Sequence, residues 1–215
     1  MKRTYLLLLI PLFVSGLALN GYGFAFKAGV PLSCVLIILA VCHIRLSELK
    51  SVWFVVAAFI FSAAGDWFLS FKGDDLTRFA AGIGMYFFAH IGYLGFALVN
   101  GKLKIVFTTV VLTGYLLFFY FMLYPVIDSS VLLFAVLIYL VISCVSLGAA
   151  GGTKFNPAAK WTYFIGISLI LISDTIISLY EFADFRELNI LILPTYYAAQ
   201  ILITFAVLKR CSEFK

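Results

Sequence analysis

Eight long apolar runs, separated by short polar or glycine- and proline-bearing stretches, take up most of this chain. They fall at 4–23, 28–44, 51–71, 77–100, 103–124, 129–150, 158–182 and 188–209. Each is close to the roughly 20 residues that a helix needs to cross a bilayer. Backbone in lipid must satisfy its own hydrogen bonds, so only helices or a closed barrel can span a membrane. The runs therefore predict a multi-pass integral membrane protein.

The composition excludes several classes of protein. Of the 215 residues, 64% are hydrophobic and 12% are charged, against roughly 25% charged in an average soluble domain. The segments between the runs are too short for a separate soluble domain, which excludes a soluble protein and a single-span receptor. The net charge of +5 indicates membrane orientation and attraction to anionic lipid. We therefore expect membrane lipid, and no nucleic acid, among the partners.

The runs favour helices over a barrel. A barrel strand would alternate apolar and polar residues over roughly ten positions, and the run at 131–147 shows no such alternation. The predicted fold class is all-α: a polytopic bundle of about eight transmembrane helices forming one domain over 1–215. The first run has an alternative interpretation as a cleaved signal peptide, because Lys2 and Arg3 precede its apolar core.

Lysine and arginine in the connecting segments predict the orientation. Eleven of them fall on the side that carries both ends of the chain, and four fall on the other side, namely Lys27, Lys72, Arg78 and Arg186. We therefore expect both termini in the cytoplasm, in the inner membrane if the source is bacterial. An even number of spans is needed to keep this bias consistent along the chain.

Cysteine and histidine give little sign of a metal or redox site. Three of the four cysteines, Cys34, Cys42 and Cys144, lie in apolar runs, Cys211 lies near the C-terminus, and no CxxC pair occurs. We expect all four to act as small buried hydrophobic residues. The chain has only two histidines, too few for a histidine-rich metal site. We predict neither a metal nor a cofactor.

Two aspartates lie inside the runs, where an ionisable group is costly and therefore suggests function. Asp66 is in the third run and Asp174 is in the seventh. Each is about 15 residues from the predicted cytoplasmic start of its helix, so at 1.5 Å per residue they lie at similar depth. The alternative is that the two carboxyl groups serve only as hydrogen-bonded clamps between helices.

Other polar residues fall at helical spacing near the same depth. On the fourth run His90 and Tyr93 share a stripe, and on the eighth Tyr197 and Gln200 do so. Asn20 reaches a comparable level near the outer end of the first run. These five residues are candidates for binding substrate.

The two aspartates also hint at an internal duplication. They are 108 positions apart, and Ser70 and Ser178 repeat at the same offset. Two four-helix halves related by an axis along the membrane normal would place the aspartates symmetrically about one cavity.

Four short motifs carry a resemblance to a known family. They are Gly65–Asp66 with Leu69 after it, the HIGY sequence at His90–Tyr93, Ser173–Asp174, and the TYYAAQ sequence at Thr195–Gln200. In this order they resemble the YhhN-like lysoplasmalogenase family, whose members are multi-pass proteins with about eight helices. The similarity extends over roughly residues 50–208.

The resemblance implies hydrolysis of the vinyl ether bond of a lysoplasmalogen, a lysophospholipid, to a fatty aldehyde and glycerophosphocholine or glycerophosphoethanolamine. This chemistry needs one carboxylic acid to protonate the alkene and one carboxylate to stabilise the cation and deprotonate water, as in two-carboxylate glycosidases. Asp66 and Asp174 suit these roles, and the sequence leaves open which is the acid. We expect Lys72, Arg78 and Arg186, on the outer side, to attract the phosphate.

Two other functions fit the same residues. Membrane-embedded aspartate, histidine and tyrosine also form proton relays, as in a small proton-coupled transporter. A non-catalytic lipid-binding protein would use the aspartates as structural clamps. Head-group preference, chain preference and oligomeric state do not follow from the sequence.

Overall fold

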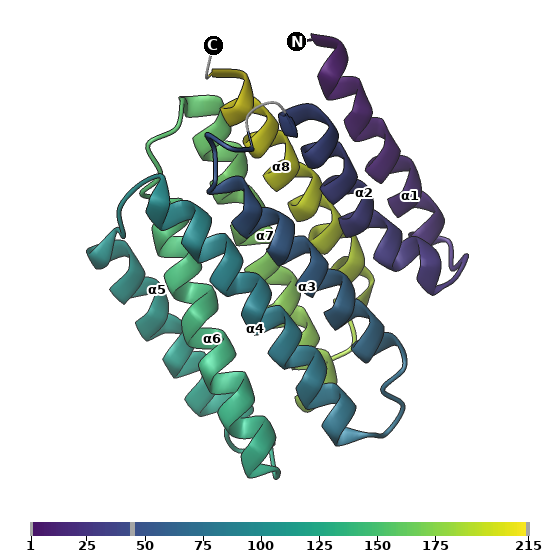
Figure 1. Cartoon of the computed structure of the whole chain (residues 1–215). Coiled ribbons are helices and arrows are strands. Elements are labelled where there is room, and N and C mark those ends of the chain that lie inside the picture. The colour runs from purple at the N-terminus through teal and green to yellow at the C-terminus, as the bar shows by residue number, and fades with distance from the viewer. Residues whose placement is uncertain (1, 44–45, 214–215) are drawn as a thin grey trace.

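The computed structural model describes residues 2–43 and 46–213, and these form an all-α bundle (Figure 1). Its α-helices are α1 (Leu9–Leu19), α2 (Phe24–Cys42), α3 (Val52–Ser70), α4 (Leu76–Val99), α5 (Ile105–Phe118), α6 (Ser130–Ala150), α7 (Pro157–Phe182) and α8 (Ile192–Glu213). Three short segments, η1 (Lys2–Leu8), η3 (Phe119–Leu123) and η4 (Asn189–Leu191), are 3₁₀ or π in form. The predicted end of the second span, residue 44, lies outside the described residues.

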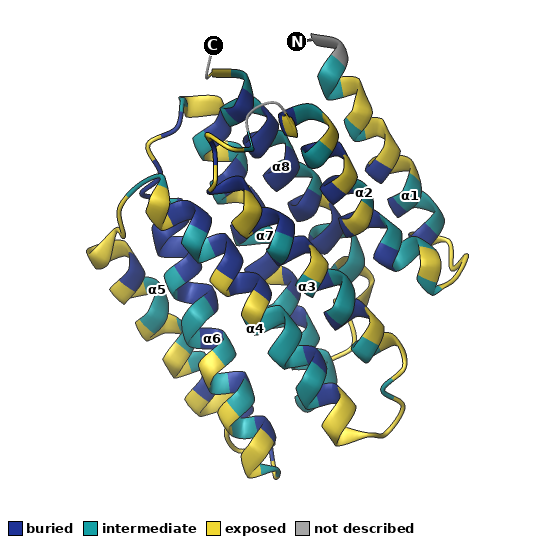
Figure 2. Ribbon diagram, in the orientation of Figure 1, coloured by how far each residue is buried: buried dark blue, intermediate teal, exposed yellow. Residues whose placement is uncertain are grey.

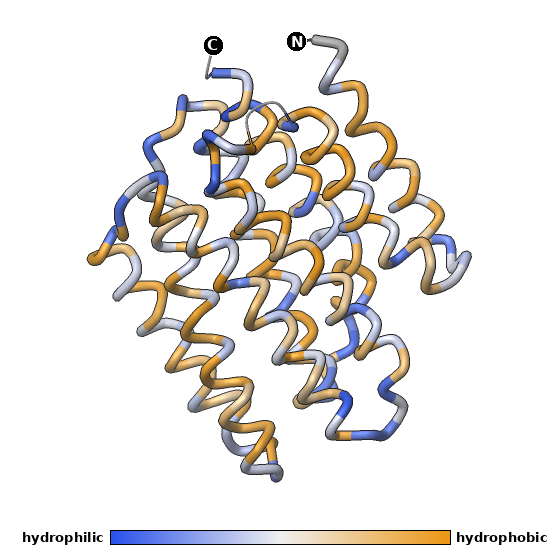
Figure 3. Tube along the Cα trace, viewed as in Figure 1, coloured by the Kyte–Doolittle hydropathy of each residue, from blue (hydrophilic) through white to orange (hydrophobic). Residues whose placement is uncertain are grey.

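The helices alternate in direction, so α1 begins and α8 ends at the same end of the bundle (Figure 1). We call this the terminal end and the other the distal end. Figure 3 shows polar residues gathered at both ends and apolar residues between them. Among the described residues, seven helical segments are long and apolar enough to cross a membrane. The all-helical membrane bundle predicted from the sequence is confirmed.

Two predicted spans take a different form from a single regular helix. The first, 4–23, becomes η1 followed by α1, which ends at Leu19 and is shorter than the others. The fifth, 103–124, becomes α5 followed by the π turn η3. Hydropathy detects an apolar segment but does not register changes in helical hydrogen bonding, so neither irregularity was predictable from it.

Local capping explains where several helices begin. The Asp75 carboxylate accepts hydrogen bonds from Thr77 N and Arg78 N at the start of α4, at 2.8 and 3.2 Å. At the start of α7, Asn156 Oδ1 accepts from Ala159 N at 2.9 Å, and Pro157 occupies the first turn. Both arrangements satisfy helix amides that would otherwise lack a partner.

The helix pairings repeat at an offset of four. α1 packs on α2 as α5 packs on α6, α2 on α3 as α6 on α7, α3 on α4 as α7 on α8, and α2 on α8 as α6 on α4. This is the pattern that two four-helix halves would give. Asp66 and Asp174 occupy equivalent helices in it, α3 and α7.

The core lies where α2, α3, α4, α7 and α8 meet, and exposed residues cover the outward faces (Figure 2). Small residues allow close helix contact there, as is usual in membrane proteins. A Cβ added at Gly92 on α4 would lie 2.5 Å from the backbone oxygen of Phe54 on α3. By contrast, only 11% of the α5–η3 span is buried within the bundle.

A disulfide joins Cys42, the last residue of α2, to Cys211 of α8 at the terminal end, with a Cα–Cα distance of 6.0 Å. The sequence-based expectation that all four cysteines are unpaired is therefore wrong for these two. They are 169 positions apart, and sequence alone does not give disulfide connectivity. Cys34 and Cys144 are free and buried, as expected.

Candidate functional site

Asp66 of α3 and Asp174 of α7 line the same cavity, which has a volume of about 180 Å³ and lies towards the distal end. Side chains from α2, α4 and α8 complete its wall, among them Lys27, Tyr86, Tyr196 and Tyr197. The two intramembrane aspartates of the sequence are thus brought together in one space, with aromatic and cationic side chains around them.

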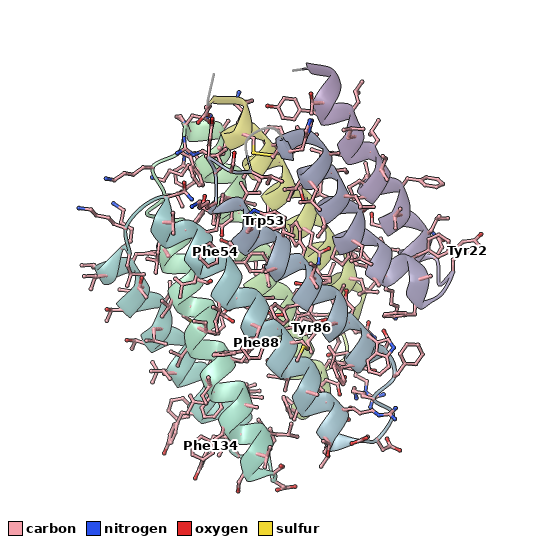
Figure 4. All side chains as sticks on the ribbon, in the orientation of Figure 1. Tyr22, Trp53, Phe54, Tyr86, Phe88 and Phe134 are labelled. Atoms are coloured by element: carbon pink, nitrogen blue, oxygen red, sulfur yellow. A yellow bond between two sulfur atoms is a disulfide. The ribbon has the colours of Figure 1, made fainter. Side chains whose placement is uncertain are left out.

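Asp66 is buried, and its closest partner is a tyrosine of the neighbouring helix. The Tyr86 hydroxyl donates to Asp66 Oδ1 at 2.5 Å, whereas Asp66 Oδ2 is buried and has no hydrogen-bond partner among the described residues. Gly65 makes room for this contact, because a Cβ there would lie 2.9 Å from the Tyr86 ring. Figure 4 shows Tyr86 among the central helices, whereas Tyr22 points out from the edge of the bundle.

Asp174 has two partners, Tyr139 and His90, neither of which lines the shared cavity. The Tyr139 hydroxyl of α6 donates to Asp174 Oδ2 at 2.6 Å, and His90 Nε2 of α4 lies 3.6 Å from the same oxygen. His90 is almost fully buried, and the Asp174 side chain is 14% exposed. Each aspartate is therefore held by one tyrosine hydroxyl, and only Asp174 also has a histidine beside it.

Asp174 borders three separate spaces inside the bundle. Besides the shared cavity, it lines two smaller, mainly apolar spaces of about 40 and 60 Å³. Tyr139 and Val136 line both of these. A substrate with a polar head and an apolar chain would have its junction at this aspartate.

The other candidates from the sequence fall at different distances from the cavity. Tyr197 lines it. His90 does not line it, but its Nε2 lies 3.6 Å from Asp174, which does. Tyr93 is buried behind it, with its hydroxyl 3.3 Å from Ser62 Oγ. Gln200 is fully buried on α8. Asn20 is not brought to the site: it is exposed after the end of α1, and its amide donates to Gly16 O at 2.8 Å.

Unpaired polar atoms cluster around the two aspartates. Among the described residues, the following buried atoms have no hydrogen bond within 3.5 Å: Asp66 Oδ2, both ring nitrogens of His90, the hydroxyls of Tyr196 and Tyr197, and, about one turn further along α8, both amide atoms of Gln200. Such atoms are rare in folded proteins and call for a specific explanation. Their concentration here marks this region as the candidate functional site.

The cations expected to attract phosphate are engaged elsewhere. Lys72 forms an ion pair with Glu181 at 3.0 Å. Arg78 donates to Phe71 O at 2.9 Å and lies 3.4 Å from Asp75. Arg186 donates to Asp184 at 2.7 Å, and this hydrogen bond raises the pKa of Arg186. None of these three lines the aspartate cavity, whereas Lys27 of α2 does.

Three residues of the site were not among the sequence-derived candidates. Lys27 was assigned to a connecting segment, because the apolar run defining its helix starts at 28, but α2 begins at Phe24. Tyr86 falls at helical spacing from His90 and Tyr93 on α4. From the sequence alone, however, a site tyrosine at this position cannot be distinguished from a tyrosine that only packs between helices. Tyr139 lies in a run whose other polar residues are all serines, and its hydroxyl is the only signal that the sequence offers.

The described residues contain no cluster of three or more His, Cys, Asp or Glu side chains suited to hold a metal ion. The side chains in and beside the aspartate cavity supply the carboxyl groups of Asp66, Asp174 and Glu181, several tyrosine hydroxyls, the His90 imidazole and the Lys27 ammonium group.

Comparison with known proteins adds one match. No curated protein sequence and no solved structure matches this chain significantly. The model of the YhhN family matches residues 25–207. This range contains both aspartates, α3 to α7, and most of α2 and α8. Because this match covers most of the chain, the protein belongs to the YhhN family.

Proposed function

We propose that this YhhN protein is a membrane-embedded lysoplasmalogenase, which hydrolyses the vinyl ether bond of lysoplasmalogens by acid–base catalysis with Asp66 and Asp174. The observation that supports this most is the presence of both carboxyl groups, from separate helices, in one cavity inside the bundle. Membership of the family supports a role of this kind.

The proposed reaction begins with a proton transfer to carbon. The protonated aspartate gives its proton to the alkene carbon remote from the ether oxygen, which leaves an oxocarbenium ion. The ionised aspartate stabilises this cation. It then takes a proton from a water molecule as the water oxygen forms a bond to the oxocarbenium carbon. Two carboxyl groups support an oxocarbenium-like transition state in glycosidases in the same way.

The hemiacetal that forms then breaks down, and both aspartates regain their starting states. Its hydroxyl proton passes to the first aspartate as the carbon–oxygen bond to glycerol breaks. The second aspartate gives its proton to the departing glycerol oxygen. The products are a fatty aldehyde and the glycerophospho-alcohol, with one water consumed and no redox change.

The size of the cavity limits how much of the substrate it holds. Pockets for drug-sized ligands are usually about 300–1,000 Å³, so a cavity of about 180 Å³ would take the vinyl ether and glycerol but not the chain. We assign the alkenyl chain to the apolar side of Asp174, along Val136 and Tyr139. From there it would extend between helices into lipid.

Purified protein incubated with three lysolipids of equal chain length tests the proposal. These are a 1-alkenyl, a 1-acyl and a 1-alkyl lysophosphatidylethanolamine, and the readout is released aldehyde together with released fatty acid. We expect aldehyde from the vinyl ether alone and no product from the alkyl ether, since its saturated carbon cannot be protonated to give a stabilised cation.

Other results would favour the rival functions. Fatty acid released from the acyl lipid would make the protein a carboxylic ester hydrolase instead of a vinyl ether hydrolase. Movement of lysolipid or protons across vesicles without any covalent change would favour a transporter. No turnover and no flux would leave the aspartates as structural clamps and would overturn the proposal.

A further inference from the structure

Lys27 is the cation of the aspartate cavity. It lies in the first turns of α2, is partly buried, and lines the cavity with Asp66, Asp174, Tyr180 and Glu181. Its charge acts on Asp66, yet within the described residues it forms no ion pair within 4.0 Å and no hydrogen bond through its side chain. A lysine so placed keeps its ammonium group available to an anion.

The neighbouring charges leave this role to Lys27. Glu181, on the same wall, is already neutralised by Lys72 at 3.0 Å. Arg78 and Arg186 pair with carboxylates of their own segments, and their side chains are 53% and 69% exposed. An anion entering from the distal end therefore meets one unpaired cation beside the catalytic carboxyl groups.

We propose that Lys27 binds the phosphate of the lysolipid and so selects substrates that carry a phosphodiester head group. This inference rests on the proposed function, and it deepens it by naming the residue that recognises the head group. Lysine is a common phosphate ligand that acts as a point charge, and its long apolar stem allows the ammonium group to reach the cavity from the end of a membrane helix.

The geometry also orders the substrate along the cavity. Lys27 joins the wall from α2 at the distal end, whereas Asp174 borders the apolar spaces lined by Val136 and Tyr139. Phosphate at Lys27, the vinyl ether between the aspartates and the chain beyond Asp174 follow the order of these groups in a lysoplasmalogen.

The test compares two substrates that differ only in the phosphate. Wild type, Lys27→Met and Lys27→Arg are assayed for aldehyde release from a 1-alkenyl lysophosphatidylethanolamine and from the corresponding 1-alkenylglycerol. For the phospholipid we expect Lys27→Met to raise KM about 10- to 100-fold, the range for loss of a charge-assisted contact, with kcat little changed. We expect Lys27→Arg to keep a KM for the phospholipid close to that of wild type. For the phosphate-free substrate, we expect neither variant to change KM or kcat.

Arg78→Gln is the matched control, because it removes one positive charge from the distal end but outside the cavity. Its KM and kcat for both substrates should equal those of wild type. An equal loss of kcat on both substrates in Lys27→Met would show that Lys27 only supports Asp66, and would overturn the inference.

Binding separates this inference from the proposed reaction. A 1-alkyl lysophosphatidylethanolamine and the matching 1-alkylglycerol are titrated into each variant, and their dissociation constants are measured. Weaker binding of the phospholipid alone by Lys27→Met supports the phosphate site even if wild type releases no aldehyde. Unchanged binding of both lipids would overturn it even if the lysoplasmalogenase reaction is found.

Discussion

At the scale of single residues, the site depends on which hydroxyl faces which carboxyl group. Tyr86 holds Asp66 at 2.5 Å and Tyr139 holds Asp174 at 2.6 Å. In the proposed reaction these hydrogen bonds would fix each carboxyl group in the position needed for proton transfer, so the tyrosines are positioning residues.

Removing either hydroxyl should slow catalysis without preventing binding. For Tyr86→Phe and Tyr139→Phe we expect kcat to fall about 3- to 100-fold, since a hydrogen bond contributes about 0.5–1.5 kcal/mol to a neutral group and about 1.5–3 kcal/mol to a charged one; the larger loss identifies the ionised aspartate. The ring remains, so KM should change little. Tyr22→Phe, at an exposed position, is the control. Full activity in both cavity variants would remove the tyrosines from the mechanism.

A substitution at Gly65 tests the Asp66–Tyr86 hydrogen bond without changing Tyr86 itself. In Gly65→Ala the new methyl group would meet the Tyr86 ring at 2.9 Å, so the ring must shift relative to Asp66. We expect a loss of kcat similar to that of Tyr86→Phe, and little further loss when the two are combined, because they act on one contact. Gly84→Ala, with open space around it, should behave as wild type; additive losses in the double variant would contradict this account.

The aspartates were predictable at this scale, whereas their partners were not. A carboxyl group inside an apolar run is conspicuous because charge in a membrane is costly. A tyrosine in such a run, like Tyr139, is equally expected for packing, so its hydroxyl becomes informative only when Asp174 is seen beside it. Lys27 was missed because the apolar run begins after it, although the helix does not.

At the scale of helices, close approach between pairs sets the position of the site. α3 carries Asp66 and α4 carries Tyr86, so the separation of these two helices determines whether Asp66 keeps its hydrogen bond from Tyr86. Gly92 lies at a close contact between them, opposite the backbone of Phe54.

A side chain at Gly92 should therefore destabilise the protein. In Gly92→Ala the Cβ would lie 2.5 Å from Phe54 O, and backbone atoms cannot move aside as a side chain can. We expect a loss of about 1–3 kcal/mol, the usual cost of overpacking, measured by thermal unfolding in detergent. Gly114→Ala on α5, which meets nothing within 4 Å, should not be destabilised, and equal stability of the two variants would argue against close α3–α4 packing.

Hydropathy predicted the number and order of the helices, because each apolar run is long enough to form one. It did not predict that the first span is short or that α5 ends in the π turn at Phe119–Leu123, since both depend on backbone hydrogen bonding. The starts of α4 and α7 follow from side chains that the sequence does contain, Asp75 and Asn156.

At the scale of the whole molecule, two observations bear on its orientation. The excess of lysine and arginine on the terminal side favours a cytoplasmic location for that side. The Cys42–Cys211 disulfide lies at the same end, and disulfides are rare in the cytoplasm. The connectivity of this pair was beyond the sequence, because it depends on α2 and α8 being neighbours.

We expect the charge bias to determine the orientation in cells. A fluorescent protein fused to the C-terminus should fluoresce, and alkaline phosphatase fused at the same point should be inactive. An active phosphatase fusion would reverse the orientation and place the aspartate cavity towards the cytoplasm.

The repeated helix pairing places Asp66 on α3 and Asp174 on α7, and both line one shared cavity. In the proposed mechanism neither aspartate can act alone, since one must give a proton while the other takes one. The most direct test is therefore to remove each carboxyl group in turn.

The measurement is aldehyde release from a lysoplasmalogen by purified Asp66→Asn and Asp174→Asn, with Asp128→Asn, an exposed aspartate at the distal end, as control. We predict that both cavity variants remain folded by size-exclusion chromatography and thermal unfolding and release no aldehyde above background, while the control equals wild type. Wild-type activity in either folded cavity variant would contradict the two-carboxylate account.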